Sequence, residues 1–143
     1  MKKKMLNVLI LASGCLTLPV SAAPFDGAQP LICASTEILE CIPGDGCSRV
    51  TAESIDAPQF IRIDFAANAL SAERVGGGTK VSQIERSETV DGELMLQGAE
   101  DGVEGVRDGL GWTLAIGQET GKMSLTASGD EVGFVIFGAC TAI

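Results

Sequence analysis

The chain has 143 residues, of which 45% are hydrophobic and 20% charged, and its net charge is −9 at neutral pH. This length fits one domain, and the composition is that of a globular protein rather than a disordered or collagen-like one. The chain contains no histidine. Ser-His and Cys-His catalysis, histidine-ligated metals and a histidine pH switch are therefore excluded.

The first 22 residues have the pattern of a secretory signal peptide. Three lysines, Lys2 to Lys4, precede an apolar stretch that runs from Met5 to Val20. Val20-Ser21-Ala22 supplies small residues at the two positions that a signal peptidase reads, so we expect cleavage after Ala22. The mature protein is then a single domain, residues 23–143, in the periplasm or outside the cell.

Two alternatives exist for this segment. A membrane span is disfavoured because the apolar stretch is short and is interrupted by Gly14 and Pro19. A lipoprotein signal, with Cys15 lipidated after Ala12-Ser13-Gly14, is the minority alternative, since the hydrophobic region continues past the cysteine.

Removal of residues 1–22 takes away three of the ten basic residues and no acidic ones, which changes the net charge from −9 to −12. This charge argues against binding to nucleic acid, which requires clustered lysine and arginine, and against anionic membrane surfaces. A basic protein partner or a small ligand is compatible with it, and solubility alone would also explain it. The oligomeric state is left open.

Four cysteines remain after cleavage: Cys33, Cys41, Cys47 and Cys140. An even number in an exported chain indicates two disulfides, and four cysteines allow three pairings. We predict Cys41–Cys47, because the five residues between them favour a turn, and Cys33–Cys140, which would join the first strand to the last. Metal binding by thiolates is disfavoured because the chain lacks a CxxC pair.

Short alternating segments predict an all-β fold of about eight strands with at most one short helical turn, at Thr51–Ile55. The architecture expected is a small antiparallel up-and-down barrel or a sandwich. The last strand is apolar on both faces and should be central, and a Cys33–Cys140 bond beside the first strand would close a barrel. The predicted strands are Leu31–Glu40, Phe60–Phe65, Ala69–Arg74, Val81–Val90, Glu93–Gly98, Gly111–Gly117, Lys122–Ser128 and Glu131–Cys140.

Several stretches resemble a group of small exported proteobacterial proteins that end in Phe-Gly-Ala-Cys. These stretches are Cys33–Cys41, Ala57–Phe65, Gly111-Trp112, Glu119–Met123 and Phe134–Cys140. The resemblance covers most of the mature chain. It implies export and the cysteines, and it implies no activity.

The candidate binding residues lie in an acidic, glycine-rich loop and at the start of the strand that follows: Glu100, Asp101, Glu104, Asp108 and Trp112. The loop could present a charged surface to a basic partner. Its carboxylates could also hold calcium, but their spacing does not match an EF-hand, so we predict no metal and no other cofactor. Trp112 could line a ligand pocket, although a single tryptophan that begins a strand is more often part of the core.

No catalytic motif emerges. Nineteen acidic residues guarantee some carboxylate pair, so a glycosidase-like pair carries little information. Lys80 with Ser82, or Lys122 with Ser124, could form a Ser-Lys pair, but surface lysines are the simpler interpretation.

The first functional hypothesis is therefore an exported, non-enzymatic binding or interaction module, with inhibition of a basic secreted enzyme as its sharper form. Periplasmic lysozyme inhibitors are similar in size and export, but their Ser-Gly-x-x-Tyr loop is missing because the chain has no tyrosine. The alternatives are a carboxylate-based hydrolase acting on envelope material and a structural envelope protein. A packed barrel interior would exclude the hydrolase.

Overall fold

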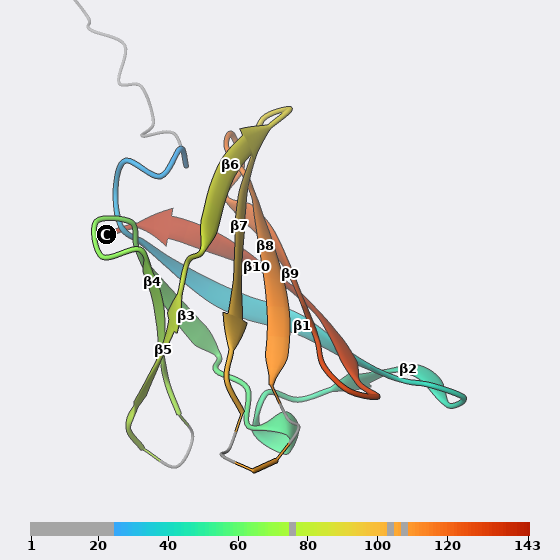
Figure 1. The fold of residues 1–143 in the computed structure, drawn as a ribbon. Coiled ribbons are helices and arrows are strands. Elements are labelled where there is room, and N and C mark those ends of the chain that lie inside the picture. Colours follow the sequence, from blue (N-terminus) through green and yellow to red (C-terminus); the bar gives the residue numbers. More distant parts are fainter. Residues whose placement is uncertain (1–24, 75–76, 103–104, 107–108) are drawn as a thin grey trace, which may run out of the picture.

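The computed structural model describes residues 25–74, 77–102, 105–106 and 109–143. These residues form one antiparallel sheet of ten strands, curled into a half-barrel (Figure 1). Their only helical element is a 3-10 turn, η1 (Glu53–Ile55). The predicted all-β class and single short helical turn are therefore confirmed. The strands are β1 (Leu31–Ile42), β2 (Gly46–Val50), β3 (Phe60–Asp64), β4 (Ala69–Glu73), β5 (Thr79–Gln83), β6 (Arg86–Val90), β7 (Glu93–Glu100), β8 (Leu110–Gly117), β9 (Lys122–Ser128) and β10 (Gly133–Ala142).

The strand order is β5-β4-β3-β1-β10-β9-β8-β7-β6, and β2 pairs with β1 outside this path. The last strand, β10, is central and pairs with the first, as predicted. Both predicted disulfides are present, and each joins residues directly opposite one another: Cys33 with Cys140 and Cys41 with Cys47.

The expectation that the Cys33–Cys140 bond closes the barrel is wrong. This bond lies in the middle of the sheet, whereas the two edges are β5 and β6. These edge strands are consecutive in the chain, and the sequence predicted them as one strand. The break lies at Ile84 and Glu85. Ile84 N–H donates to Asn68 O at 2.8 Å, towards β4, and Glu85 N–H donates to Gln97 O at 2.9 Å, towards β7.

The chain therefore crosses from one edge of the sheet to the other at this point and draws the edges together. We call the line along which β5 faces β7 the seam. One side-chain bond there runs from the hydroxyl of Ser82 to the carbonyl of Ala99, at 3.4 Å. Closure of the half-barrel thus depends on the middle of the chain rather than on its two ends.

Because Gly98 on β7 has no side chain, the backbone of β5 and the ring of Trp112 can approach β7 closely at the seam. A Cβ atom at Gly98 would overlap the carbonyl oxygen of Gln83 and lie 2.8 Å from Cε2 of Trp112. We expect Gly98→Ala to lower the free energy of unfolding by about 1–3 kcal/mol or more, the usual cost of overpacking. Urea denaturation measures this change. Gly111→Ala is the matched control on β8, because a Cβ atom there meets no atom within 4 Å; an equal loss in both variants would contradict a close approach at Gly98.

The sequence missed β2. Its five residues, Gly46–Val50, pair with Ile38–Ile42, a stretch that extends two residues beyond the predicted end of the first strand at Glu40. Four of the five are exposed, so the segment has no alternation between buried and exposed positions that could have revealed it. The β6–β7 turn was predicted correctly: Asp91 and Gly92 both have positive φ, at 50° and 81°, as a two-residue hairpin turn requires.

The interior is filled unevenly. At the end of the half-barrel near the β6–β7 turn, Leu94 lies opposite Ile116 and Leu31 lies opposite Ile63, and all four are at most 3% exposed. Phe25 packs against this core as well, and its N–H donates to Gln118 O at 3.2 Å. The opposite end, above η1, holds a cavity.

Candidate ligand-binding site

The cavity occupies the lower mouth of the half-barrel and has a volume of about 280 Å³. Its walls come from β3, β4, β5, β7, β8, β9 and β10, and the segment from Ile55 to Pro58 adds a further side. The larger apolar side chains that line it include Ile61, Leu70, Trp112, Leu125, Phe134 and Ile136. Barrel mouths with apolar walls and a few polar groups are frequent ligand sites.

Trp112 belongs both to the core and to the cavity wall. Its side chain lies in the main hydrophobic cluster, and the residue is 6% exposed. Its indole Nε1–H donates to the hydroxyl of Ser82 at 2.8 Å. The predicted core role is confirmed. Trp112 also lines the cavity, and its role in a ligand pocket stays a prediction.

Ser82 is the polar residue that the sequence analysis did not connect with Trp112. It is 7% exposed and is the one buried polar residue found in the part of the chain that the structure describes. Side chains alternate between the two faces of β5, and this alternation is the signal that could have placed Ser82 in the interior: Val81 is 58% exposed, and Ser82 points to the opposite face. The hydroxyl of Ser82 thus joins β5 to both Trp112 on β8 and Ala99 on β7.

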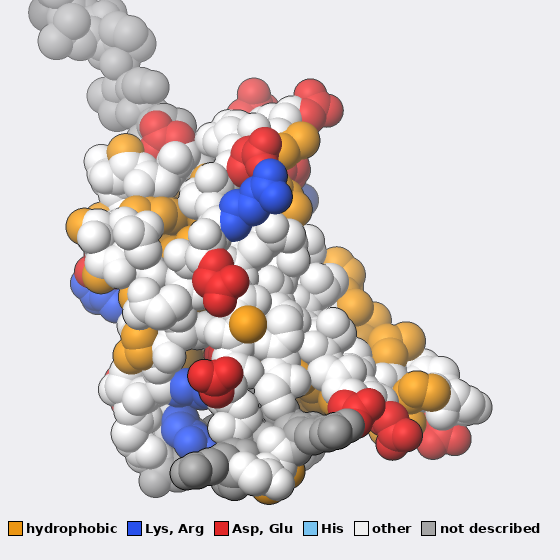
Figure 2. Space-filling model, viewed as in Figure 1, with side chains coloured by type: hydrophobic (Ala, Val, Ile, Leu, Met, Phe, Trp, Pro, Cys, Tyr) orange, Lys and Arg blue, Asp and Glu red, His pale blue; other side chains and the backbone are white. Residues whose placement is uncertain are grey.

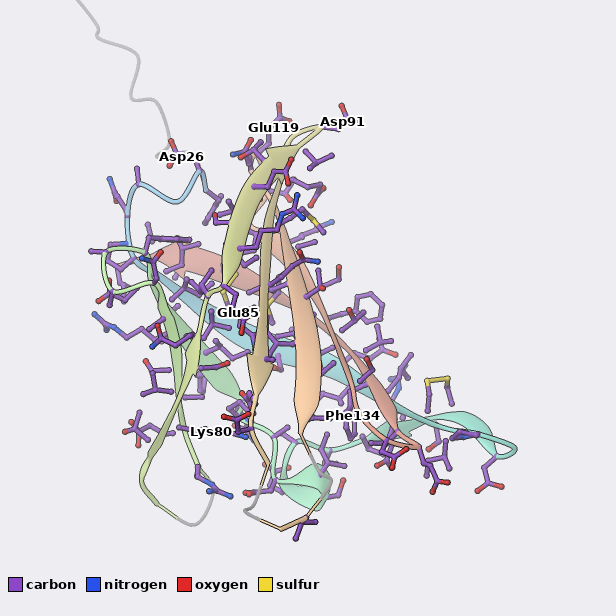
Figure 3. The ribbon with its side chains drawn as sticks, viewed as in Figure 1. Asp26, Lys80, Glu85, Asp91, Glu119 and Phe134 are labelled. Carbon is purple, nitrogen blue, oxygen red and sulfur yellow. A yellow bond between two sulfur atoms is a disulfide. The ribbon has the colours of Figure 1, made fainter. Side chains whose placement is uncertain are left out.

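Charged side chains line the rim of the cavity in opposite pairs. Lys80 on β5 forms an ion pair with Glu100 on β7, across the seam. Arg74 pairs with Asp56 at 3.0 Å, and Glu73 accepts a hydrogen bond from Thr79 at 2.8 Å. Figure 3 shows Lys80 low on β5, and Figure 2 shows basic side chains adjoining acidic ones low on the same face.

The segment that contains η1 is fixed by local hydrogen bonds. Ser54 N–H donates to Thr51 Oγ1 at 3.2 Å, and the amide of Gln59 donates to the carboxylate of Glu53. The backbone N–H of Glu53 itself, followed by the bonds from Thr51 and Gln59, lowers the pKa of the Glu53 carboxyl. This carboxylate therefore stabilises the segment above its unfolded-state pKa, and the contribution is lost as the pH falls through the lowered folded-state pKa.

The arrangement does not form a catalytic pair at the described lining residues. Lys80 pairs with Glu100 rather than with Ser82, so its side chain is directed towards a carboxylate and away from the hydroxyl. Glu100 and Asp56 each face a cation. A glycosidase instead requires two carboxylates placed on either side of a sugar.

The structure brings two of the five predicted binding residues to the cavity, Glu100 and Trp112. Asp101 is exposed and does not line the cavity. Glu104 and Asp108 lie outside the described residues, so the acidic-loop surface stays a prediction. Other acidic residues lie far from the cavity: Figure 3 shows Asp91 and Glu119 at the opposite tip.

Within residues 25–74, 77–102, 105–106 and 109–143, no three cysteine or acidic side chains come close enough to hold a metal ion. Over the same described residues, no helix has the length and apolar character needed to cross a membrane. The two disulfides are consistent with an oxidising compartment such as the periplasm or the cell exterior.

Comparison of the chain with protein-family models, with curated proteins and with solved structures found no match.

Proposed function

We propose that the protein is an exported, non-enzymatic binding module that holds a small, largely apolar ligand in the mouth of its half-barrel. The cavity of about 280 Å³ carries this proposal, because the remainder of the interior is filled by a single hydrophobic cluster. Its volume is close to the lower end of ligand sites, about 300 Å³. The ligand is therefore smaller than a typical drug-sized molecule.

Export supports this function and is proposed with it. The signal-peptide pattern of residues 1–22 and the two disulfides agree on an oxidising compartment. A disulfide-linked sheet also gives the cavity a rigid wall. A rigid site loses little conformational entropy when a ligand binds, so the entropic cost of binding is small. Of the two partner classes that the acidic charge allows, the cavity favours the small ligand over the basic protein.

Octanol, a neutral amphiphile, is a suitable first probe, because the chain has one tryptophan and no tyrosine. Trp112 lines the cavity, so all indole emission comes from the proposed site. We expect octanol to shift and saturate this emission. Ala127→Leu should abolish the response, because Ala127 lines the cavity and a larger side chain would fill it.

The control is Ala139→Leu, which changes the same residue type at an exposed position on β10, beside the buried Cys140. This variant should bind octanol like the parent. Equal responses in both variants, or no saturable response in the parent, would contradict the proposed function.

A further inference from the structure

The ion pair at the rim of the cavity joins β5 to β7 across the seam. Lys80 lies on β5 and Glu100 lies at the end of β7, and both line the cavity. The bonds of Ser82 close the seam next to this pair. A ligand that enters the cavity at the rim therefore passes both charged groups.

The two residues of this ion pair differ in burial. The side chain of Glu100 is 24% exposed, whereas that of Lys80 is 49% exposed. Lysine carries its ammonium on a flexible four-carbon stem, so Lys80 can turn into solvent at little cost. Glu100 is set in the wall, and a partly buried carboxylate without a partner is unfavourable. A group that displaces Lys80 must itself supply a positive charge.

The charge balance of the rim also favours a positively charged ligand. Three carboxylates line the cavity, those of Asp56, Glu73 and Glu100, against the two cations Arg74 and Lys80. The whole chain is also acidic, with a net charge of −9. An anionic ligand would bring a further negative charge beside these carboxylates, whereas a cationic one would be attracted by them.

The apolar walls set the size of the remainder of the ligand. An apolar cavity of about 150 Å³ is large enough for benzene. A cavity of about 280 Å³ then has room for an apolar body of about ten carbon-sized atoms, by the same comparison.

We infer that the ligand is an amphiphilic amine, whose apolar body fills the cavity and whose ammonium replaces Lys80 as the partner of Glu100. This inference rests on the proposed function and specifies the chemistry of the ligand. The amine remains protonated and no covalent bond forms or breaks.

Three probes with the same alkyl chain test the head group: octylamine, octanol and octanoate. Their dissociation constants can be measured from Trp112 emission and by calorimetry. We expect octylamine to bind about tenfold more tightly than octanol, since a hydrogen bond to a charged partner is worth at least that factor. Octanoate should bind most weakly.

Variants of the ion pair test the residues. Glu100→Gln should weaken the binding of octylamine about tenfold more than it weakens the binding of octanol. Lys80→Met removes the competing cation and should strengthen octylamine binding. Glu88→Gln is the matched control, because Glu88 pairs with Arg86 on β6, away from the cavity, and it should change nothing.

The outcomes separate the inference from the proposed function. Equal binding of octylamine and octanol, or tightest binding of octanoate with a loss in Lys80→Met, would overturn the amine while the apolar site stands. Equal losses of octylamine and octanol binding in Glu100→Gln would show that Glu100 supports the shape of the cavity rather than binding the head group, and would also overturn the inference. If none of the three probes binds, the proposed function fails with it.

Discussion

Replacing Cys33 and Cys140 together by alanine should lower the free energy of unfolding by about 5 kcal/mol. The bond closes a loop with a sequence separation of 107 residues. In the chain-entropy model, the loss grows with the logarithm of the loop length. Guanidinium denaturation of the oxidised parent and of the double variant measures the difference.

The second disulfide provides a comparison with the same chemical change. Cys41 and Cys47 are only six residues apart, so their replacement by alanine should cost about 2 kcal/mol. The larger effect also has a structural reason, since Cys33 and Cys140 are 0% and 8% exposed and join the two central strands. Equal losses for the two pairs would show that loop length does not govern their contributions.

Trp112→Ala should lower the free energy of unfolding by about 3–5 kcal/mol, the usual cost of removing a large buried aromatic side chain. The Trp112 ring is buried and holds the hydroxyl of Ser82. Its removal enlarges the existing cavity and takes away the donor that joins β8 to β5. Urea denaturation followed by circular dichroism measures the loss without relying on indole emission.

Trp112→Phe separates packing from hydrogen bonding. Phenylalanine keeps much of the buried area but cannot donate to Ser82, so we expect a smaller loss, of about 1–3 kcal/mol. A Trp112→Ala variant that unfolds at the same urea concentration as the parent would show that the ring contributes nothing to the core.

The strand pattern was predictable where one face of a strand is buried. Ile61 and Ile63 alternate with exposed neighbours in β3. Leu94 and Leu96 alternate with exposed or half-buried neighbours in β7, because a half-buried strand repeats every two residues. The hairpin turn at Asp91-Gly92 was predictable for its own reason, its need for positive φ. The exposed strand β2 has neither property and was missed.

Closure of the half-barrel could not be read from local pattern. The segment Val81–Val90 was predicted as one polar strand, and its division at Ile84 and Glu85 arises from hydrogen bonds to Asn68 and Gln97. Asn68 precedes β4 and Gln97 lies on β7, so these acceptors belong to the strands next to the two opposite edges of the sheet. Which edges meet is a property of the whole sheet, so the cysteine pairing, though correct, led to the wrong closure.

The site was predictable in part. Trp112 and Glu100 were singled out because one is the only tryptophan and the other begins an acidic loop. Their partners, Ser82 and Lys80, lie 30 and 20 positions earlier in the chain and meet them only when the seam forms. Sequence spacing carries no information about such a contact, so the cavity itself could not be predicted.

The indole N–H resonance of Trp112 gives the most direct test of the account, since the protein has one tryptophan and thus one such signal. A heteronuclear NMR titration with octanol should shift this resonance together with the amides of Leu125 and Ile136, which line the cavity. The amides of Leu31 and Ile63, in the packed half of the interior, should stay in place. An unchanged indole resonance at saturating octanol, or shifts spread evenly over both halves, would contradict a ligand site in the mouth of the half-barrel.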